Sequence, residues 1–184
     1  MRRTVIPGVG AVAAVAAVVV GAALAGTSAS IYTYKATMSV GAERPKPSAP
    51  AAAKGVFTAT VTESGSTRLL KWKLTYSGLS GNAVAAHVHK GKAGVAGAVL
   101  VPLCGPCKSG QTGQVKIKKD IGDAMERGLT YVNVHTAKNA AGEIRGQVKL
   151  VGEHEGTAPA ATSPTTTSPS GGGDDSGGYT PPGY

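Results

Sequence analysis

Residues 57–76 of the chain read FTATVTESGSTRLLKWKLTY, and they carry its clearest secondary-structure pattern. Apolar side chains fall on every second residue of two runs, and they are Phe57, Ala59, Val61, Leu70, Trp72, Leu74 and Tyr76. Threonine or lysine lies between them, so each run has one apolar and one polar face, as half-buried antiparallel strands do. Gly65, between the runs, tolerates the positive φ that tight hairpin turns require. The stretch therefore predicts a β-hairpin.

The same analysis extends through the rest of the central region. Further strands are predicted over residues 82–90, 98–103, 114–118, 129–136 and 143–150. A single short helix is predicted over residues 120–127, with Asp120 as its N-cap. About seven short strands separated by glycine-rich turns favour an all-β fold, an antiparallel β-sandwich that is immunoglobulin-like or copper/zinc superoxide dismutase-like. Trp72 and Tyr131 are its expected core aromatics.

The first 25 residues have the features of an export signal. Met1-Arg2-Arg3 supplies the positive start, residues 9–24 are uninterrupted Ala, Val, Gly and Leu, and Ala23-Leu24-Ala25 fits the cleavage pattern. We therefore predict a signal peptide over residues 1–25 and a secreted or cell-surface protein. The alternative is an uncleaved membrane anchor, because the apolar run approaches the ~20 residues that span a bilayer.

Composition divides the remainder into three parts. Residues 26–54 are rich in proline and alanine and are predicted to be a linker. Residues 55–152 form the predicted β-sandwich domain, and residues 153–184, rich in Thr, Ser, Pro and Gly, are predicted to be a disordered tail.

The chain is basic, with a formal net charge of +9. Residues 55–152 contain 13 Lys and Arg against 5 Asp and Glu, so the domain carries most of the excess. No arginine-rich run or aromatic-interleaved patch occurs, and we predict no specific nucleic-acid binding. The expected partner is an extracytoplasmic protein or an anionic cell-surface polymer, with membrane contact only through an uncleaved N-terminal segment.

Five motifs together resemble the CHRD (chordin) domain family over Gly55 to about Leu150. They are LxWxL at 70–74, GLSG at 78–81, AHVHKG at 86–91, YVNVHT at 131–136 and GEIRGQ at 142–147. The resemblance implies an extracytoplasmic β-sandwich module. In chordin such domains belong to a protein that binds growth factors, whereas bacterial members generally have no assigned activity. We therefore expect a binding or surface-structural module, exported from a bacterium, without catalysis of its own.

Three histidines form the alternative hypothesis, a metal site. His87 and His89 are two residues apart on a predicted strand, so both imidazoles project from one face, and His135 lies in the second histidine motif. Such a group could hold copper or zinc and have a redox role. The pattern is similar to the copper ligands of copper/zinc superoxide dismutase, although a bridging histidine and a clear aspartate ligand are missing. The competing interpretation is structural, with His87 and His89 bonded to turn backbone or to Glu143.

Two further groups have structural and functional interpretations. Cys104-Gly105-Pro106-Cys107 matches the thioredoxin tetrapeptide, but residues 108–113 are poor helix formers, so a local disulfide is expected in place of thiol catalysis. Asn133, Glu143 and Arg145 are expected to form a polar cluster, with Glu143 and Arg145 paired on one strand face.

Overall fold

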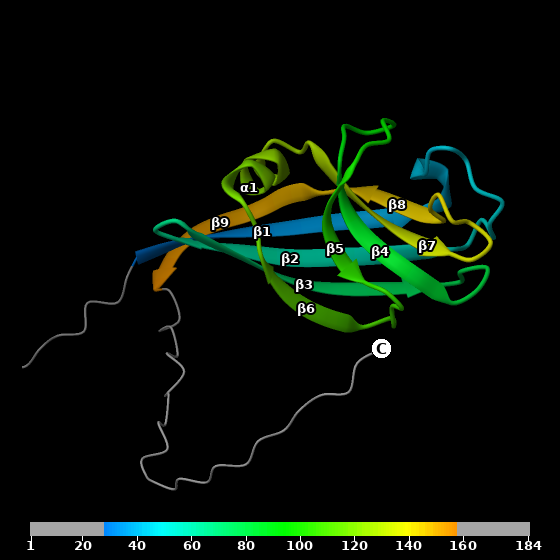
Figure 1. Ribbon diagram of the computed structural model, residues 1–184, viewed down its shortest axis with the longest axis horizontal. Helices are drawn as coiled ribbons and strands as arrows, with labels where there is room; N and C mark the ends of the chain where they lie inside the picture. Colours follow the sequence, from blue (N-terminus) through cyan, green and yellow to red (C-terminus); the bar gives the residue numbers. More distant parts are fainter. Residues whose placement is uncertain (1–27, 158–184) are drawn as a thin grey trace, which may run out of the picture.

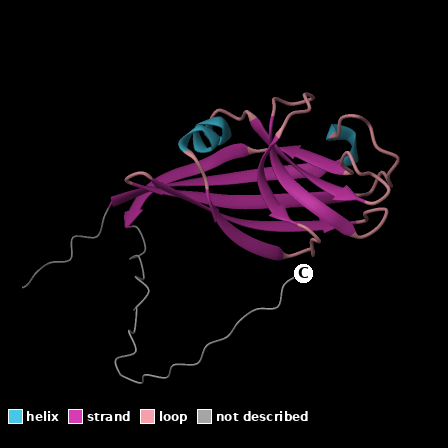
Figure 2. Cartoon of the chain, in the orientation of Figure 1, coloured by secondary structure: helices cyan, strands magenta, loops and turns pink. Residues whose placement is uncertain are grey.

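The computed structural model describes residues 28–157, which form one curved β-sheet with a short helix (Figures 1 and 2). The strands are β1 (Ser28–Ser39), β2 (Lys54–Ser64), β3 (Thr67–Ser77), β4 (Ala83–Lys90), β5 (Val99–Cys104), β6 (Gln111–Lys116), β7 (Thr130–Thr136), β8 (Ile144–Gln147) and β9 (Lys149–Thr157). The helix α1 spans Lys119–Glu126, and a 3₁₀ turn, η1, spans Val40–Ala42. Within these residues no helix is long and apolar enough to cross a membrane.

All strand pairings are antiparallel, in the order β5-β4-β7-β8-β1-β2-β3-β6, with β9 also pairing with β1. The sheet curves so that the β5-β4-β7-β8 half crosses in front of the β1-β2-β3-β6 half (Figure 1). The apolar faces of the two halves meet in one core, which includes Phe57, Leu70, Trp72, Val88 and Val132. This arrangement confirms the predicted all-β, face-packed fold.

The predicted hairpin is present. β2 and β3 pair along their whole length, from Lys54 opposite Ser77 to Ser64 opposite Thr67. Gly65 in the turn has φ 56°, in the left-handed region that glycine enters without steric cost. The alternating pattern places Phe57 and Leu74 opposite each other and fully buried.

The predicted linker over residues 26–54 is wrong for its first part. Residues 28–39 form β1, which pairs with β2, β8 and β9. Its buried residues Tyr34, Ala36 and Met38 alternate with exposed ones, a signal that the neighbouring proline-rich sequence obscured. This strand belongs to the core.

The C-terminal part of the sheet also differs from the prediction. The single strand expected over residues 143–150 is two strands, β8 and β9, because Val148 between them turns into the core. β9 continues to Thr157, so residues 153–157 of the predicted tail belong to the sheet. The sheet thus has nine strands where about seven were expected. The predicted signal peptide over residues 1–25 and most of the predicted tail lie outside the described residues.

The helix is where it was expected, but its cap is not. α1 begins at Lys119, Lys118 occupies the N-cap position without a side-chain cap, and Asp120 lies in the first turn. The Asp120 carboxylate accepts a hydrogen bond from the Ile121 amide at 3.0 Å, so it still satisfies one free donor of the helix start.

Strand β7 is buried along its entire length, which is unusual for a strand of a two-layer fold. Val132 and Val134 face the core, while Tyr131, Asn133 and His135 face the opposite side. That side is covered by the β4–β5 loop (residues 91–98) and the β7–β8 loop (residues 137–143). Carbonyls of these loops accept hydrogen bonds from His89 on β4, His135 on β7 and Arg145 on β8. The protein therefore has a second, polar interior, and the candidate site lies in it.

Candidate metal site

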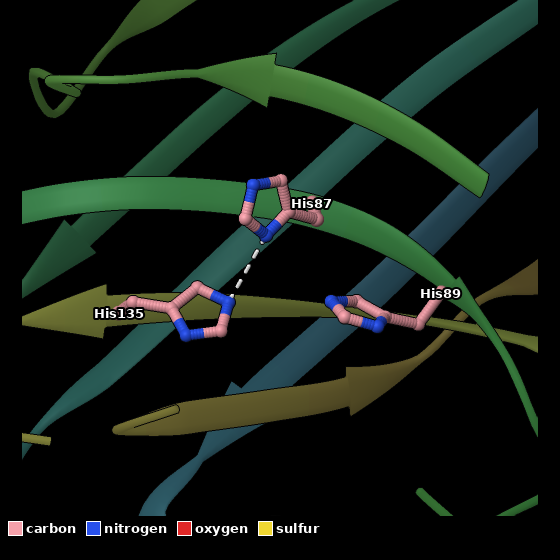
Figure 3. Close-up of side chains that lie close together, drawn as sticks. All are labelled: His87, His89 and His135. Atoms are coloured by element: carbon pink, nitrogen blue, oxygen red, sulfur yellow. Dashed lines mark hydrogen bonds between the residues drawn. The ribbon is translucent and has the colours of Figure 1, made fainter. Parts of the chain in front are cut away.

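The structure brings His87, His89 and His135 together on β4 and β7 (Figure 3). Ala85 lies opposite His135 and His89 opposite Tyr131, so the three imidazoles project from one face of the strand pair. One ring nitrogen from each histidine lies within 4.8 Å of the other two. Among the described residues no other group of three or more His, Cys, Asp or Glu residues has this spacing.

Backbone carbonyls fix the proton position on two of the rings. His89 Nδ1 lies 2.9 Å from the Gly97 carbonyl oxygen, and His135 Nδ1 lies 2.9 Å from that of Ala140. A carbonyl oxygen only accepts hydrogen bonds, so each Nδ1 carries the proton. In the neutral rings Nε2 of both histidines then presents its lone pair to the cluster. This is the second-sphere arrangement that orients metal-bound histidines.

The third ring joins the cluster through a hydrogen bond. His87 Nδ1 lies 3.1 Å from His135 Nε2. Because the proton of neutral His135 is on Nδ1, its Nε2 accepts and His87 Nδ1 donates. An ion bound between them would replace this shared proton, as metal binding at histidine does in general.

The third candidate ligand atom, Nε2 of His89, gives the strongest indication that a bound ion is missing. His89 Nε2 is buried and, within residues 28–157, has no hydrogen-bond partner. Buried polar atoms of native proteins almost always have one, and an ion is one explanation for an exception. Bonds of about 2.0–2.1 Å around a tetrahedral ion separate the ligand atoms by about 3.4 Å. The ligand atoms lie within 4.8 Å of one another, so they need to approach by no more than about 1.4 Å to bind one ion.

The surroundings of His87 and His135 favour their uncharged rings. Burial lowers the pKa of His87, and the nearby His135 and His89 lower it further. Burial likewise lowers the pKa of His135, although its hydrogen bond to Ala140 acts in the opposite direction. Neutral imidazole is the form that binds metal, so the site is prepared for an ion at neutral pH.

Tyr131 and Arg145 hold His89 and its neighbouring loop in position. The rings of His89 and Tyr131 are stacked, with centroids 4.9 Å apart and 9° between their planes. The Arg145 guanidinium lies 3.3 Å from the centre of the Tyr131 ring. Arg145 also donates from Nη2 to the carbonyls of Lys92 and Val95, at 3.1 and 2.6 Å. These carbonyls belong to the loop that contains Gly97, so Arg145 fixes the loop that orients His89.

The predicted cluster of Asn133, Glu143 and Arg145 is divided in two. Glu143 accepts hydrogen bonds from Ser80, Thr136 and Asn139. Burial acts to raise the pKa of Glu143, but these hydrogen bonds outweigh it and lower the pKa overall. The expected Glu143–Arg145 pair is therefore wrong. Of the two structural alternatives for the histidines, the bond to loop backbone is present for His89, and neither His87 nor His89 bonds to Glu143.

The carboxylate near Arg145 is Glu43, a residue that the sequence analysis missed because it lay in the predicted linker. Both side chains are buried, and Asn133 lies opposite Arg145 on β7. Burial raises the pKa of Glu43 overall. The hydrogen bond from the Arg44 amide and the charge of Arg145 act in the opposite direction. Gly142 is required here, because it has φ 130° and a Cβ at this position would collide with the Glu43 carboxylate.

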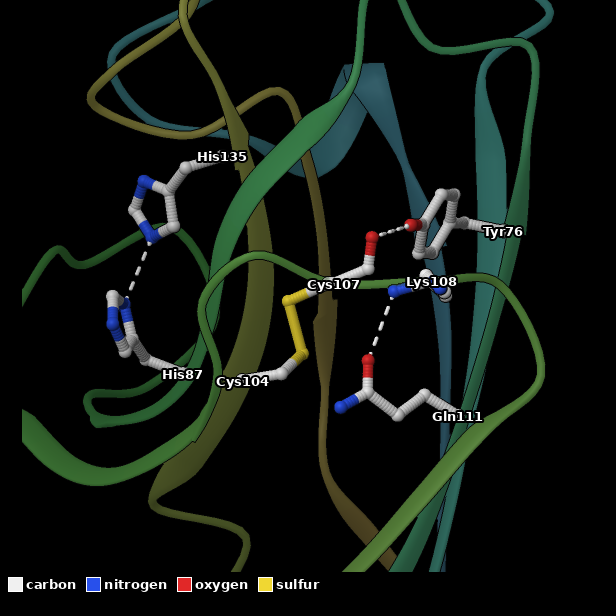
Figure 4. Close-up of a disulfide and its surroundings, with 7 residues drawn as sticks. All are labelled: Tyr76, His87, Cys104, Cys107, Lys108, Gln111 and His135. Atoms are coloured by element: carbon white, nitrogen blue, oxygen red, sulfur yellow. Dashed lines mark hydrogen bonds between the residues drawn. A yellow bond between two sulfur atoms is a disulfide. The ribbon is translucent and has the colours of Figure 1, made fainter.

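The two cysteines form the predicted disulfide at the end of β5 (Figure 4). Cys104 lies opposite Ala86, next to His87 on β4. The Cys107 amide donates to the Ala83 carbonyl at 3.0 Å, and the Tyr76 hydroxyl donates to the Cys107 carbonyl at 2.8 Å. The first cysteine ends a strand and does not begin a helix, so the thioredoxin interpretation lacks the helix dipole that lowers a thiol pKa.

We expect a Cys104→Ser/Cys107→Ser variant to fold and to lose about 2 kcal/mol of stability, because the closed loop is so short. Chemical denaturation of the two proteins measures the difference, with metal affinity unchanged. Complete unfolding of the variant, or disulfide reductase activity of the unmodified chain towards insulin, would contradict the structural role.

Comparison with known proteins adds one finding. The family model described as the CHRD domain matches residues 34–148, which begin within β1 and end just before β9. No curated protein and no solved structure matches the chain. The likeness to immunoglobulin or copper/zinc superoxide dismutase folds therefore stays a prediction.

Proposed function

The chain belongs to the CHRD domain family, and we propose that it is an exported binding module of that family whose ligand is a transition-metal ion. His87, His89 and His135 would supply the ligands. The sequence favoured a non-catalytic binding or surface-structural module, with metal binding as the alternative. The histidine geometry supports the alternative as the specific form of the binding role. A protein partner stays a prediction.

Export is supported by two features. Residues 1–25 have the sequence pattern of a signal peptide, and a disulfide persists more readily outside the reducing cytoplasm. We propose a secreted or cell-surface location, in a bacterium, on these grounds.

The observation that carries the metal proposal is the buried Nε2 of His89, which has no partner within residues 28–157 and faces two further imidazoles. A ligand set made only of imidazoles suits copper and zinc better than magnesium or calcium. Three imidazoles around a tetrahedral ion leave the fourth position for water or another ligand. A redox role would require copper and stays part of the proposal to be tested.

The test is titration of the purified full chain with copper(II) and with zinc. We expect one ion per chain by elemental analysis after gel filtration, and perturbation of the His87, His89 and His135 imidazole signals in NMR spectra. Magnesium at the same concentration should leave these signals unchanged. Failure to retain either ion, or perturbation confined to His154, would reject the proposal.

The histidine pKa values also predict how stability depends on pH. His87 and His135 have folded-state pKa values below the ordinary 6.5, so the unfolded chain takes up protons first as the pH falls. The contribution of these two histidines to the free energy of unfolding is complete above pH 6.5. It is lost as the pH falls from there through their folded-state pKa values. We expect the metal-free protein to show this loss in urea unfolding. A His87→Asn/His135→Asn variant should show a weaker dependence over the same range, and an equal dependence would contradict the assignment.

A further inference from the structure

The outer face of the β9-β1-β2-β3-β6 part of the sheet is basic and bears hydroxyl groups. Six exposed lysines project from it: Lys35, Lys54, Lys71, Lys73, Lys116 and Lys149. The residues between them on this face are mainly threonines. Among the described residues, no Asp or Glu lies in the rows of opposed outward residues that contain these lysines. The salt bridges of the described residues, Arg68–Glu63 and Lys119–Asp123, do not involve the lysines either.

The arrangement of the lysines costs stability. Lys35 lies directly opposite Lys149 on the neighbouring strand, and like charges at such positions are destabilising. Lys71 and Lys73 project from the same side of β3, about 6.6 Å apart along the strand. A bound anion would relieve this repulsion.

The face is also hollowed. A shallow hollow of about 560 Å³ is lined by Thr58, Thr60, Lys71, Lys73, Thr112 and Gln114. A second hollow of about 250 Å³ lies beside it on the same face, and its lining includes Thr37, Lys54 and Thr75. Both offer ammonium and hydroxyl donors, and the first adds the Gln114 amide; these groups bind anionic oxygens.

We propose that this face binds a linear polymer that carries repeated phosphate groups. A chain of spaced anions matches a row of spaced lysines beside two hollows. A bilayer surface fits less well, because most exposed large apolar side chains of the described residues (Val84, Val95, Val99 and Leu150) are outside the lysine and threonine rows. Only Val151 lines a hollow with Lys35 and Lys149. The face is separate from the histidine cluster, which lies on the other half of the sheet.

The test measures binding of the full chain to long-chain inorganic polyphosphate. A Lys35→Gln/Lys71→Gln/Lys73→Gln variant is expected to bind about a hundredfold more weakly, at about fivefold for each lysine. The matched control is Lys90→Gln/Lys92→Gln/Lys138→Gln, which removes the same charge from exposed positions elsewhere and should stay within about twofold. Circular dichroism confirms that both variants fold, and Lys71→Gln/Lys73→Gln replaces the triple variant if it does not.

Three results would overturn the proposal. They are absence of polyphosphate binding by the unmodified chain, equal losses in the face variant and the control, and tighter binding to phosphatidylglycerol vesicles than to polyphosphate. The last result would indicate a lipid surface as the partner. A metal chelator should leave polyphosphate binding unchanged, so this test is independent of the histidine site.

Discussion

A His89→Ala variant is expected to bind copper(II) or zinc about a hundredfold more weakly than the unmodified chain. Structural zinc sites bind with roughly 10–16 kcal/mol through four ligands, so one ligand accounts for about 3 kcal/mol. His89 supplies the Nε2 atom that is buried and unpartnered within residues 28–157, and its loss leaves two ligands. Competition with a chromophoric chelator measures the affinity of each protein.

The matched control is His154→Ala, which removes an exposed histidine on β9, outside the cluster. We expect its affinity to equal that of the unmodified chain. His89→Phe is the second variant, since its ring can keep the stacking on Tyr131 while it lacks a ligand nitrogen. Equal affinity in His89→Phe and His154→Ala would show that ions bind elsewhere.

Metal should also stabilise the folded chain, because an ion that binds only the folded state adds RT ln(1 + [L]/Kd). The rise in melting temperature should be present in His154→Ala and lost in His89→Ala. This second measurement separates a weakened site from a variant that is merely less stable, since the latter would still respond to added metal.

The sequence was sufficient for the hairpin and for the placement of His87 and His89 on one face, because both depend on residues two apart along a strand. Apolar residues alternate within residues 57–61 and within residues 70–76, and His87 and His89 lie on one face of any strand that contains both. That His135 would join them depended on β7 pairing with β4 in one particular register, which no local pattern specifies.

Long-range packing also explains what sequence reasoning missed. Glu43 lies in a proline-rich segment, yet it is buried beside Arg145, about a hundred residues later in the chain. Arg145 was assigned to Glu143 because alternation places them on one face of a continuous strand. The strand begins only at Ile144, and Glu143 turns towards Ser80 and Asn139. A prediction from the two-residue alternation of side chains fails where the strand ends.

An Arg145→Met variant is expected to lose about 3–5 kcal/mol of stability, the usual cost of removing one partner from a buried charged network. Arg145 is 1% exposed, and its Nη2 donates to two carbonyls of the β4–β5 loop. Methionine fills much of the space, but it leaves the Val95 carbonyl without its donor, the Lys92 carbonyl with the Val95 amide alone, and Glu43 without its nearby cation. Urea unfolding measures the loss.

Arg127→Met is the matched control, because it makes the same change at an exposed position at the end of α1 and should alter stability by no more than about 0.5 kcal/mol. Arg145→Lys should recover little, since one ammonium cannot bond to both carbonyls and stack on Tyr131 as the planar guanidinium does. A loss in Arg145→Met no larger than in Arg127→Met would contradict the proposed role of the buried arginine.

The Arg145→Met variant also tests whether the polar interior affects metal binding. Without Arg145 the loop of residues 91–98 loses two hydrogen bonds, and the Gly97 carbonyl that holds His89 Nδ1 belongs to that loop. Outer-sphere changes of this kind typically weaken metal binding about 10- to 100-fold. We therefore expect folded Arg145→Met, at a temperature below its melting transition, to bind one ion per chain with reduced affinity. Unchanged affinity would mean that the loop is held by its other contacts and that Arg145 serves stability alone.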